Sequence, residues 1–385
     1  MYELFAVTAP GVELTARAEL QRLGFLTEAV ADVEDAARET GGVTFKGELA
    51  DVYRANLHLR SVNRILVRIG HFYATSPGEV RKKAGRLNWP RFVAPGQPIA
   101  LRVTCHQSKL YHSDAVAERM AVAISDRLGA PVVVQRTADE DATDAPQLIV
   151  VRVADNKFTV SVDSSGALLH LRGYRQALAK APLRETLAAA LVMASGWDET
   201  APLLDPFCGS GAIPIEAAMI AAGLAPGRQR RFAFMSWPGF DAAGWQRLLK
   251  ENPAPRSAAM PTILASDRDA GAVQMAQENA ERAGVAQYIE FSRRAVSGIE
   301  PPAGPGWIVS NPPYGARVSA NHDVRNLYAQ FGHVLRARCS GWGVAVMCSD
   351  GQLLRQMALP LETKFMSSNG GIKVQVVVGR VPTLN

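Results

Sequence analysis

The chain has 385 residues, a length too great for one ordinary domain, so two or three domains are expected. A composition of 48% hydrophobic and 20% charged residues excludes a disordered or fibrous chain and predicts a globular protein with a large core. The net charge of +6 is a modest excess, so a polyanionic partner has to be argued from where the basic residues lie.

The first residues, Met1 to Phe5, carry an acid and no basic stretch, so no signal peptide is expected. No apolar run reaches the length of a membrane-spanning helix, and no membrane partner is expected. The four cysteines form no CxxC pair, which predicts neither a metal site nor a disulfide framework. A reducing, cytoplasmic location is the natural interpretation. The sequence does not indicate an oligomeric state.

Residues 1–72 are predicted to form a small α+β unit in which strands and helices alternate. Its strands are expected at 3–8, 42–47 and 62–72, and its helices at 11–23 and 48–59. Residues 73–163 predict a second unit. A strand is expected at 98–105, a helix at 114–128 and a short strand at 132–134. A hairpin of two strands is expected at 148–154 and 157–162.

Basic residues are concentrated between residues 60 and 115, where ten of them stand against two acids, Glu79 and Asp114. The ten are Arg60, Arg64, Arg68, Arg81, Lys82, Lys83, Arg86, Arg91, Arg102 and Lys109. A polyanion such as RNA would explain this excess, and a solvated basic face would explain it as well. The same two alternatives stay open for Arg228, Arg230 and Arg231 further along the chain.

From about residue 164 strands and helices alternate again, which predicts a doubly wound, mainly parallel sheet. Strands are expected at 203–205, 262–267, 289–291, 307–310, 343–348 and 374–378, and helices at 183–194, 212–222, 270–283 and 323–338. An insertion from about Gly223 to Pro261 separates two of these elements. Sheets of this class bind ligands at the carboxyl ends of their strands, where the candidate motifs of this chain lie.

The loop Asp205–Gly211 joins the first of these strands to a helix. Gly209 and Gly211 allow a ligand to approach the backbone, and the helix that follows points its amide groups at that ligand. The loop is not GxGxxG, and a carboxylate at the strand end repels a pyrophosphate but suits a cationic amine, so a dinucleotide is disfavoured. A plain glycine turn would explain the loop taken by itself. Cys208 lies within this loop, which disfavours it as a covalent nucleophile.

Asp267 ends the next predicted strand. An acid in this position commonly accepts hydrogen bonds from ribose hydroxyls, and the preceding glycine loop favours that role here. The alternative is that Asp267 caps the helix that begins near Ala270.

The tetrapeptide Asn311-Pro312-Pro313-Tyr314 follows the fourth of these strands. Its two prolines fix two φ angles and remove two backbone donors, so the loop is stiff and presents an amide, bare carbonyls and an aromatic ring. The Asn311 side-chain oxygen and the Pro312 carbonyl would accept the hydrogens of an exocyclic amine, and Tyr314 would stack on the base. Taken alone, the tetrapeptide fits a flipped-out nucleobase and an ordinary proline-rich turn equally well.

In combination, the Asp205 loop, the strand-end Asp267 and the Asn311–Tyr314 loop resemble the class I S-adenosylmethionine-dependent amino-methyltransferases. Further segments are similar to the THUMP-containing RNA guanine-N2 methyltransferases, and the order and spacing of these segments make the resemblance specific. They lie at 108–113, 168–175, 181–188, 225–227 and 231–237, so the likeness covers essentially the whole chain.

This resemblance implies a ferredoxin-like domain at 1–72, a THUMP RNA-binding domain at 73–163 and a Rossmann-like methyltransferase domain at 164–385. It implies methyl transfer from S-adenosyl-L-methionine to the exocyclic N2 of a guanine in RNA, with 23S rRNA as the preferred substrate. A guanine in tRNA and an adenine N6 in DNA or RNA stay open as alternatives. A non-catalytic RNA-binding protein is a further alternative, against which the intact motifs argue.

The residues that would bind the cofactor are Asp205, Phe207, Gly209, Gly211, Asp267 and Asn311. The catalytic residues would be Asn311, Pro312, Pro313 and Tyr314. Contacts with RNA are expected from Arg81, Lys82, Lys83, Lys109 and Arg231. The chain departs from the family's pattern at 291–296, which offers no acid for the adenine, and at Ala316, where a glutamate is common.

Overall fold

A computed structural model describes residues 1–27, 41–135, 146–176, 183–251, 260–314 and 324–383. The departure at Ala316 therefore lies outside the described residues. The chain forms two compact units. Unit 1 consists of Met1–Val7, Arg17–Leu169 and Arg230–Glu251, and unit 2 of Thr8–Ala16, His170–Gln229 and Asn252–Asn385. None of the described helices is long and apolar enough to cross a membrane.

Unit 1 is built on a seven-stranded sheet with the strand order β2-β3-β1-β4-β7-β6-β5. Its strands are β1 (Tyr2–Thr8), β2 (Leu26–Thr27), β3 (Gly42–Gly47), β4 (Val62–Tyr73), β5 (Ile99–His106), β6 (Gln147–Ala154) and β7 (Lys157–Asp163). Strand β7 pairs antiparallel with both β4 and β6, so strands from either side of residue 73 share this one sheet. The short strand predicted at 132–134 is reduced to a single bridge between Ile99 and Val134.

The helices predicted in residues 1–163 are all present, together with one that was not predicted. They are α1 (Glu13–Arg22), α3 (Leu49–His58), α4 (Pro77–Ala84), the 3-10 turn η1 (Trp89–Arg91) and α5 (Ser113–Leu128). Helix α4 was not predicted, although its start carries ordinary signals. Pro77 is its first residue, and the Ser76 hydroxyl accepts a hydrogen bond from the Glu79 amide at 3.4 Å. This helix carries three of the expected RNA contacts.

Part of the predicted insertion belongs to unit 1. It holds the turn η2 (Ala233–Ser236) and helix α8 (Ala242–Lys250). The segment is anchored by aromatic contacts, because the Tyr53 ring of α3 stacks on Phe234 at 4.5 Å and meets Phe240 and Trp245 edge-on. Residues distant in sequence from α3 thus complete its core.

Unit 2 contains the predicted doubly wound sheet, with seven strands in the order β10-β9-β8-β11-β12-β14-β13. They are β8 (Leu203–Asp205), β9 (Ile263–Asp267), β10 (Ile289–Arg293), β11 (Trp307–Ser310), β12 (Gly343–Cys348), β13 (Leu361–Asn369) and β14 (Ile372–Arg380). Strands β8 to β12 pair in parallel, whereas β14 is antiparallel to β12 and to β13. The mainly parallel sheet predicted from the sequence is confirmed.

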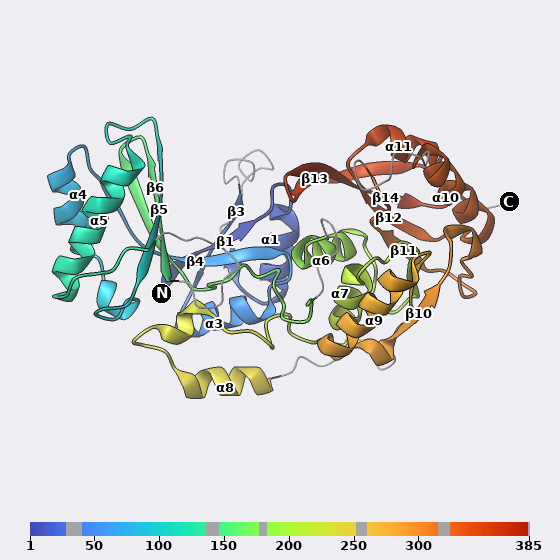
Figure 1. Ribbon diagram of the computed structural model, residues 1–385, viewed down its shortest axis with the longest axis horizontal. Coiled ribbons are helices and arrows are strands. Elements are labelled where there is room, and N and C mark those ends of the chain that lie inside the picture. The colour runs from blue at the N-terminus through green and yellow to red at the C-terminus, as the bar shows by residue number, and fades with distance from the viewer. Residues whose placement is uncertain (28–40, 136–145, 177–182, 252–259, 315–323, 384–385) are drawn as a thin grey trace. The chain divides into compact units, whose positions relative to one another are not determined.

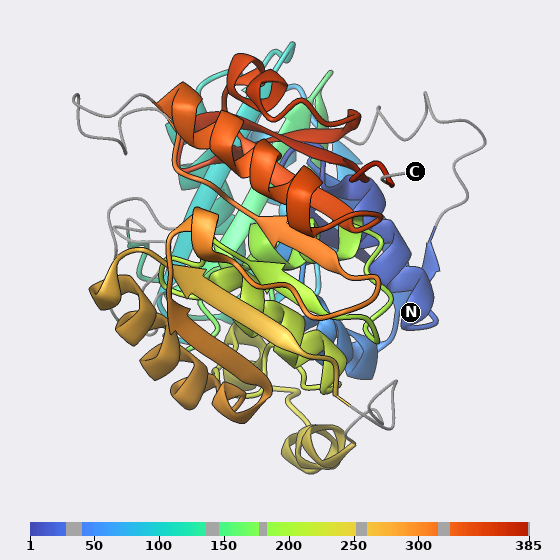
Figure 2. The ribbon, with the colours of Figure 1, turned by 90° about the vertical axis from the view of Figure 1, so that its right-hand side faces the viewer.

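Helices cover both faces of this sheet (Figure 2). They are α6 (Glu185–Ala194), α7 (Ala212–Ala221), α9 (Ala270–Ala283), α10 (Val324–Arg338) and α11 (Gly351–Gln356), with the 3-10 turns η3 (Ala286–Tyr288) and η4 (Val296–Gly298). Strand β13 was not predicted, because it lies at the edge of the sheet and its largely exposed residues show no apolar alternation.

The strand order reverses beside β8, because the chain runs outward from β8 to β10 and then returns to β11 on the other side of β8. Such a switch point opens a crevice at the carboxyl ends of the two central strands. Asp205 ends β8, Ser310 ends β11 and Asp267 ends the neighbouring strand β9. The predicted motifs therefore meet at one edge of the sheet.

Candidate active site

A cavity of about 440 Å³ lies at this edge of unit 2. The predicted residues on its wall are Asp205, Phe207, Gly209, Asp267, Asn311 and Pro313. Other wall residues were not predicted, and they include Leu183, Arg268, Arg294, Val296, Leu327 and Gln330. They lie on loops and helices with no local signal of their own. Only the crossing of the chain at the switch point brings them together.

Asp205 is almost fully buried, and its carboxylate joins the two central strands. Oδ1 accepts a hydrogen bond from the Ser310 hydroxyl at 2.5 Å and another from the Phe207 amide at 3.1 Å. Oδ2 is also buried, and it has no hydrogen-bond partner among the described residues. Burial raises the pKa of Asp205 to about 7, and the nearby Asp267 adds to the rise. The free oxygen is thus a buried acceptor on the cavity wall.

The glycine loop is held against the neighbouring strand by Asp267. The Gly209 amide donates to Asp267 Oδ2 at 3.1 Å, and the Cys208 amide donates to the Ser266 carbonyl at 3.0 Å. Helix α9 is capped by Asp269, whose side chain accepts from the Gly271 amide. The alternative role considered for Asp267, the cap of this helix, is thus filled by another residue.

The two predicted glycines differ in their surroundings. Gly209 has a φ of +51°, and no described atom lies within 4 Å of a Cβ built on it. Gly211 has a φ of +88°, is not part of the cavity wall, and a Cβ there would lie 2.9 Å from the Ala276 Cβ on α9. Gly209 therefore leaves open space beside the loop, whereas Gly211 lets α7 pack closely on α9.

The Asn311–Tyr314 loop contributes to the cavity through only part of its length. Asn311 Oδ1 is buried and has no donor within hydrogen-bond distance among the described residues. Pro313 also lines the cavity, whereas Pro312 is buried. The Tyr314 side chain is 1% exposed and is not on the cavity wall. Its ring would have to become exposed before a base could stack on it.

Cys208 lies on the cavity wall but is a weak nucleophile in this state. Burial raises the pKa of its thiol well above the usual value, and the carboxylates of Asp205 and Asp267 raise it further. The thiolate form needed for attack on a substrate is therefore scarce.

A buried ion pair holds α7, the helix that follows the glycine loop. Arg172 and Glu216 are 2% and 0% exposed, and Arg172 Nε lies 3.3 Å from Glu216 Oε1. The Tyr174 hydroxyl donates to the same carboxylate oxygen at 3.4 Å. Because Glu216 belongs to α7, the helix that follows the glycine loop, these contacts anchor that helix.

The expected RNA contacts in unit 1 differ in their interactions within the protein. Lys82, Lys109 and Arg231 are exposed. Arg81 forms an ion pair of 2.7 Å with Asp126, and Lys83 Nζ donates to the Tyr73 carbonyl at 2.7 Å.

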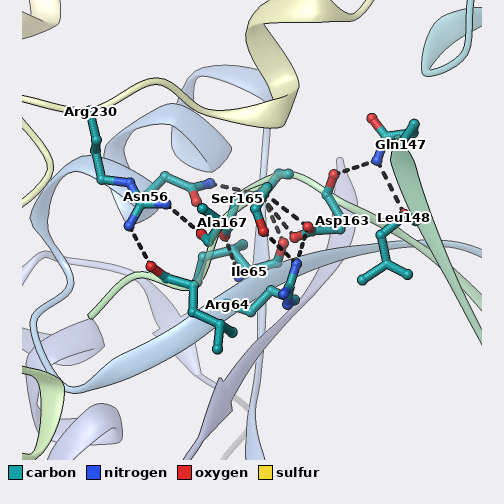
Figure 3. Close-up of polar contacts among 12 residues, drawn as sticks. Asn56, Arg64, Ile65, Gln147, Leu148, Asp163, Ser165, Ala167 and Arg230 are labelled. Atoms are coloured by element: carbon teal, nitrogen blue, oxygen red, sulfur yellow. Dashed lines mark hydrogen bonds and ion pairs between the residues drawn. The ribbon is translucent and has the colours of Figure 1, made fainter. Parts of the chain in front are cut away.

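Other basic residues singled out in the sequence are held inside unit 1. Arg64 is buried in an ion pair with Asp163, and Arg230 donates to the Ala167 carbonyl (Figure 3). Arg68 pairs with Glu3. The local excess of basic residues is therefore partly neutralised by acids that lie elsewhere in the sequence.

Residues 172–377 match the family model described as RMKL-like, methyltransferase domain. The chain belongs to this methyltransferase family. Residues 3–66 match the model of the RlmL ferredoxin-like domain, so the ferredoxin-like start is confirmed.

Two relatives extend the match. A candidate RNA methyltransferase of Synechocystis sp. is 34% identical over 370 residues, which are 96% of this chain and 94% of that protein. The ribosomal RNA large subunit methyltransferase K/L of Syntrophotalea carbinolica is 32% identical over 387 residues. That match takes in 97% of this chain but 53% of the relative, so the chain spans about half the length of that protein.

Solved structures agree with the fold of this family. A candidate methyltransferase crystallised with SAH has a TM-score of 0.83 at 27% identity, and the match covers 100% of this chain and 98% of that one. A Listeria monocytogenes protein described as a predicted N6-adenine-specific DNA methylase has a TM-score of 0.81 at 28% identity, with 97% and 95% covered.

Proposed function

We propose that this chain transfers a methyl group from S-adenosyl-L-methionine to the exocyclic N2 of a guanine in RNA, with 23S rRNA as the preferred substrate. The observation that carries the proposal is Asn311 Oδ1, a buried acceptor that no described donor satisfies, in the same cavity as Asp205. A buried polar atom without a partner is costly, so such an atom at a cavity wall is suited to a ligand that supplies the donor.

The cavity residues fit the cofactor. When bound, S-adenosylmethionine supplies an electrophilic methyl group on a sulfonium. The free Asp205 Oδ2 would accept a hydrogen bond from its amino group, and Asp267 would accept from its ribose hydroxyls. Phe207 and Gly209 form the adjoining wall, where the open space beside Gly209 admits a ligand close to the backbone. Gly211 would act indirectly, by positioning α7.

The proposed chemistry of the loop is positioning rather than strong base catalysis. The lone pair of an exocyclic amine is delocalised into the base, so the amine is a poor nucleophile. Acceptors aimed at its hydrogens favour rehybridisation of the nitrogen and orient its lone pair. Asn311 Oδ1 and the Pro312 carbonyl would be these acceptors, and Pro313 would hold them in place. Tyr314 would stack on the base after its ring becomes exposed.

RNA recognition is proposed for residues of unit 1, which includes the segment around Arg231. In the proposed organisation, the ferredoxin-like domain occupies 1–72, a THUMP domain 73–163 and the methyltransferase domain 164–385. Arg81, Lys82, Lys83, Lys109 and Arg231 would contact phosphates, and such contacts make affinity fall steeply with salt. The name of the Syntrophotalea carbinolica relative supports ribosomal RNA over tRNA.

Adenine N6 is the second candidate acceptor. The loop chemistry suits any exocyclic amine, and the Listeria monocytogenes structure is described as an adenine-specific DNA methylase. Nucleoside analysis of 23S rRNA, tRNA and DNA from a deletion strain separates the candidates. Loss of one N2-methylguanosine from 23S rRNA is expected. Loss of N2-methylguanosine from tRNA instead would identify tRNA as the substrate. Loss of N6-methyladenosine would overturn the guanine assignment.

A further inference from the structure

Part of the unit 1 sheet has one covered face and one open face: the end of β4 and the neighbouring parts of β5, β6 and β7. Helix α5 packs on β5, and Figure 1 shows α4 and α5 together on one side of β5 and β6. On β7 the side chains of Phe158 and Val160 are fully buried. Because side chains alternate along a strand, the residues between them point to the opposite, open face.

The first row of the open face runs across four strands. Tyr73 of β4 pairs with Lys157 of β7, Lys157 pairs with Ala154 of β6, and Ala154 pairs with His106 of β5. Directly paired residues share a face of the sheet. The Tyr73 side chain is 63% exposed, and Lys157 and His106 are exposed as well. An aromatic ring and a lysine thus occupy paired positions on one face of the sheet.

The second row lies next to the first. His71 of β4 pairs with Thr159, Thr159 pairs with Arg152, and Arg152 pairs with Thr104. His71 Nδ1 lies 3.1 Å from Thr159 Oγ1, which places both side chains on this face. Arg152 is exposed. The two rows therefore combine one exposed ring with cationic and hydroxyl groups.

Two acids lie near these rows, and the first of them, Glu3, is paired with a cation. Glu3 of β1 forms an ion pair with Arg68, and its other oxygen lies 3.3 Å from His71 Nε2. A second acid, Asp155, lies in the turn between β6 and β7. Arg152 and Lys157 place two exposed cations on the open face, against the one exposed acid of the adjoining turn, and cations of this kind complement a polyanion.

Hydrogen bonds hold the backbone around Tyr73, at the end of β4. The Ala74 amide donates to the Asn156 carbonyl at 3.0 Å, and the Lys109 amide donates to Asn156 Oδ1 at 2.8 Å. Lys83 Nζ donates to the Tyr73 carbonyl. Asn156 thus joins the end of β4 to the loop that carries Lys109. The exposed ring stands on an ordered backbone, so little entropy is lost when a ligand stacks on it.

We propose that the open face, defined by His71, Tyr73, Thr104, His106, Arg152 and Lys157, binds a single-stranded segment of RNA. One base would stack on Tyr73, and phosphates would contact Arg152 and Lys157. A sheet with an exposed ring suits unstacked bases, whereas a duplex keeps its bases stacked inside. This inference rests on the proposed function for its RNA substrate, and it adds the surface and the single-stranded state.

The test measures binding of the full chain to a single-stranded oligoribonucleotide and to a duplex, by fluorescence anisotropy over a range of salt. Tyr73→Ala is expected to weaken single-strand binding by about 5- to 150-fold, the loss of one stacked base, while Tyr73→Phe binds as wild type. Arg152→Ala with Lys157→Ala is expected to reduce the slope of log affinity against log salt by about 0.7 per lost phosphate contact.

Arg127→Ala is the matched control, because Arg127 is an exposed basic residue on α5, which packs on the covered face. Binding by the open-face variants equal to that of this control would overturn the inference. The inference would also be overturned if the double variant weakened RNA binding and Tyr73→Ala did not, because Tyr73 would then not contact a base. If wild type binds no RNA and methylates none, the proposed function itself fails. If wild type methylates RNA and the open-face variants bind normally, only this inference fails.

Discussion

Ser310, the last residue of β11, donates a hydrogen bond of 2.5 Å from its hydroxyl to Oδ1 of Asp205, the last residue of β8. The two residues are far apart in sequence but end neighbouring parallel strands. This bond holds the carboxylate of a cavity-wall residue in one orientation and leaves Oδ2 buried without a described partner. The pair therefore sets the direction of the acceptor on which cofactor binding is proposed to depend.

The first prediction concerns the pH dependence of cofactor binding. The raised pKa of Asp205, about 7, means that the carboxyl carries a proton at lower pH and a negative charge at higher pH. The affinity for S-adenosylhomocysteine, measured by calorimetry, is expected to fall below about pH 7 and to approach a tenfold loss per pH unit. The same shift makes the free energy of unfolding decrease as pH rises from about 4 to about 7, because the folded state holds the proton more tightly.

Asp205→Asn is the matched variant for this prediction. It is expected to bind S-adenosylhomocysteine more weakly above pH 7 and to show little pH dependence. A wild-type affinity that stays constant from about pH 8 to about pH 5.5 would contradict the role of Asp205.

The second prediction concerns Asn311. Asn311→Ala removes the buried acceptor and is expected to lower the rate of methyl transfer by about 100-fold or more, with near-normal binding of S-adenosylhomocysteine. Transfer is measured with a labelled methyl group, and binding by calorimetry. Wild-type turnover of Asn311→Ala would disprove the assignment.

The third prediction separates the two glycines of the loop. Gly211→Ala places a side chain on a left-handed backbone and against Ala276. The backbone strain and the overpacking are each expected to lower the free energy of unfolding by about 1–3 kcal/mol. Gly209→Ala meets no described neighbour and should lose only about 1–2 kcal/mol from its backbone conformation. Because Gly209 lines the cavity, its variant should bind S-adenosylhomocysteine more weakly. Urea denaturation and calorimetry measure the two effects, and equal destabilisation would contradict this distinction.

The fourth prediction concerns the buried ion pair that holds α7. Glu216→Ala leaves the Arg172 guanidinium buried without its carboxylate and is expected to lower the free energy of unfolding by about 3–5 kcal/mol. Replacing both residues, with Arg172→Met and Glu216→Leu, should recover much of this loss, because no unpaired charge then stays buried. Denaturant titrations of both variants provide the measurement. A double variant less stable than Glu216→Ala would show that the pair stabilises α7 in another way.

Much of unit 2 could be predicted because its signals are local. Apolar strands, the glycine loop and the residues that end each strand follow from periodicity and turn chemistry, and parallel strands bring their ends to one edge. Strand β13 was missed because an exposed edge strand lacks the apolar alternation that marks a half-buried one. Helix α4 was missed although Ser76 and Pro77 mark its start.

The charges show the limit of a local interpretation. Arg64 and Arg68 contribute to the basic stretch in the sequence, but Asp163 and Glu3 neutralise them in the folded chain. Counting charges within a segment cannot find these partners, because they come from other strands of the sheet.

The sequence by itself determined the fold class and the polar groups at the strand ends, since both depend on local periodicity and on residue type. Only the tertiary structure decided that Ser310 orients Asp205, that Gly211 serves packing, and that Tyr314 is buried. It also decided that Tyr73, Arg152 and Lys157 share an open face, because register across strands is a long-range property of the folded sheet.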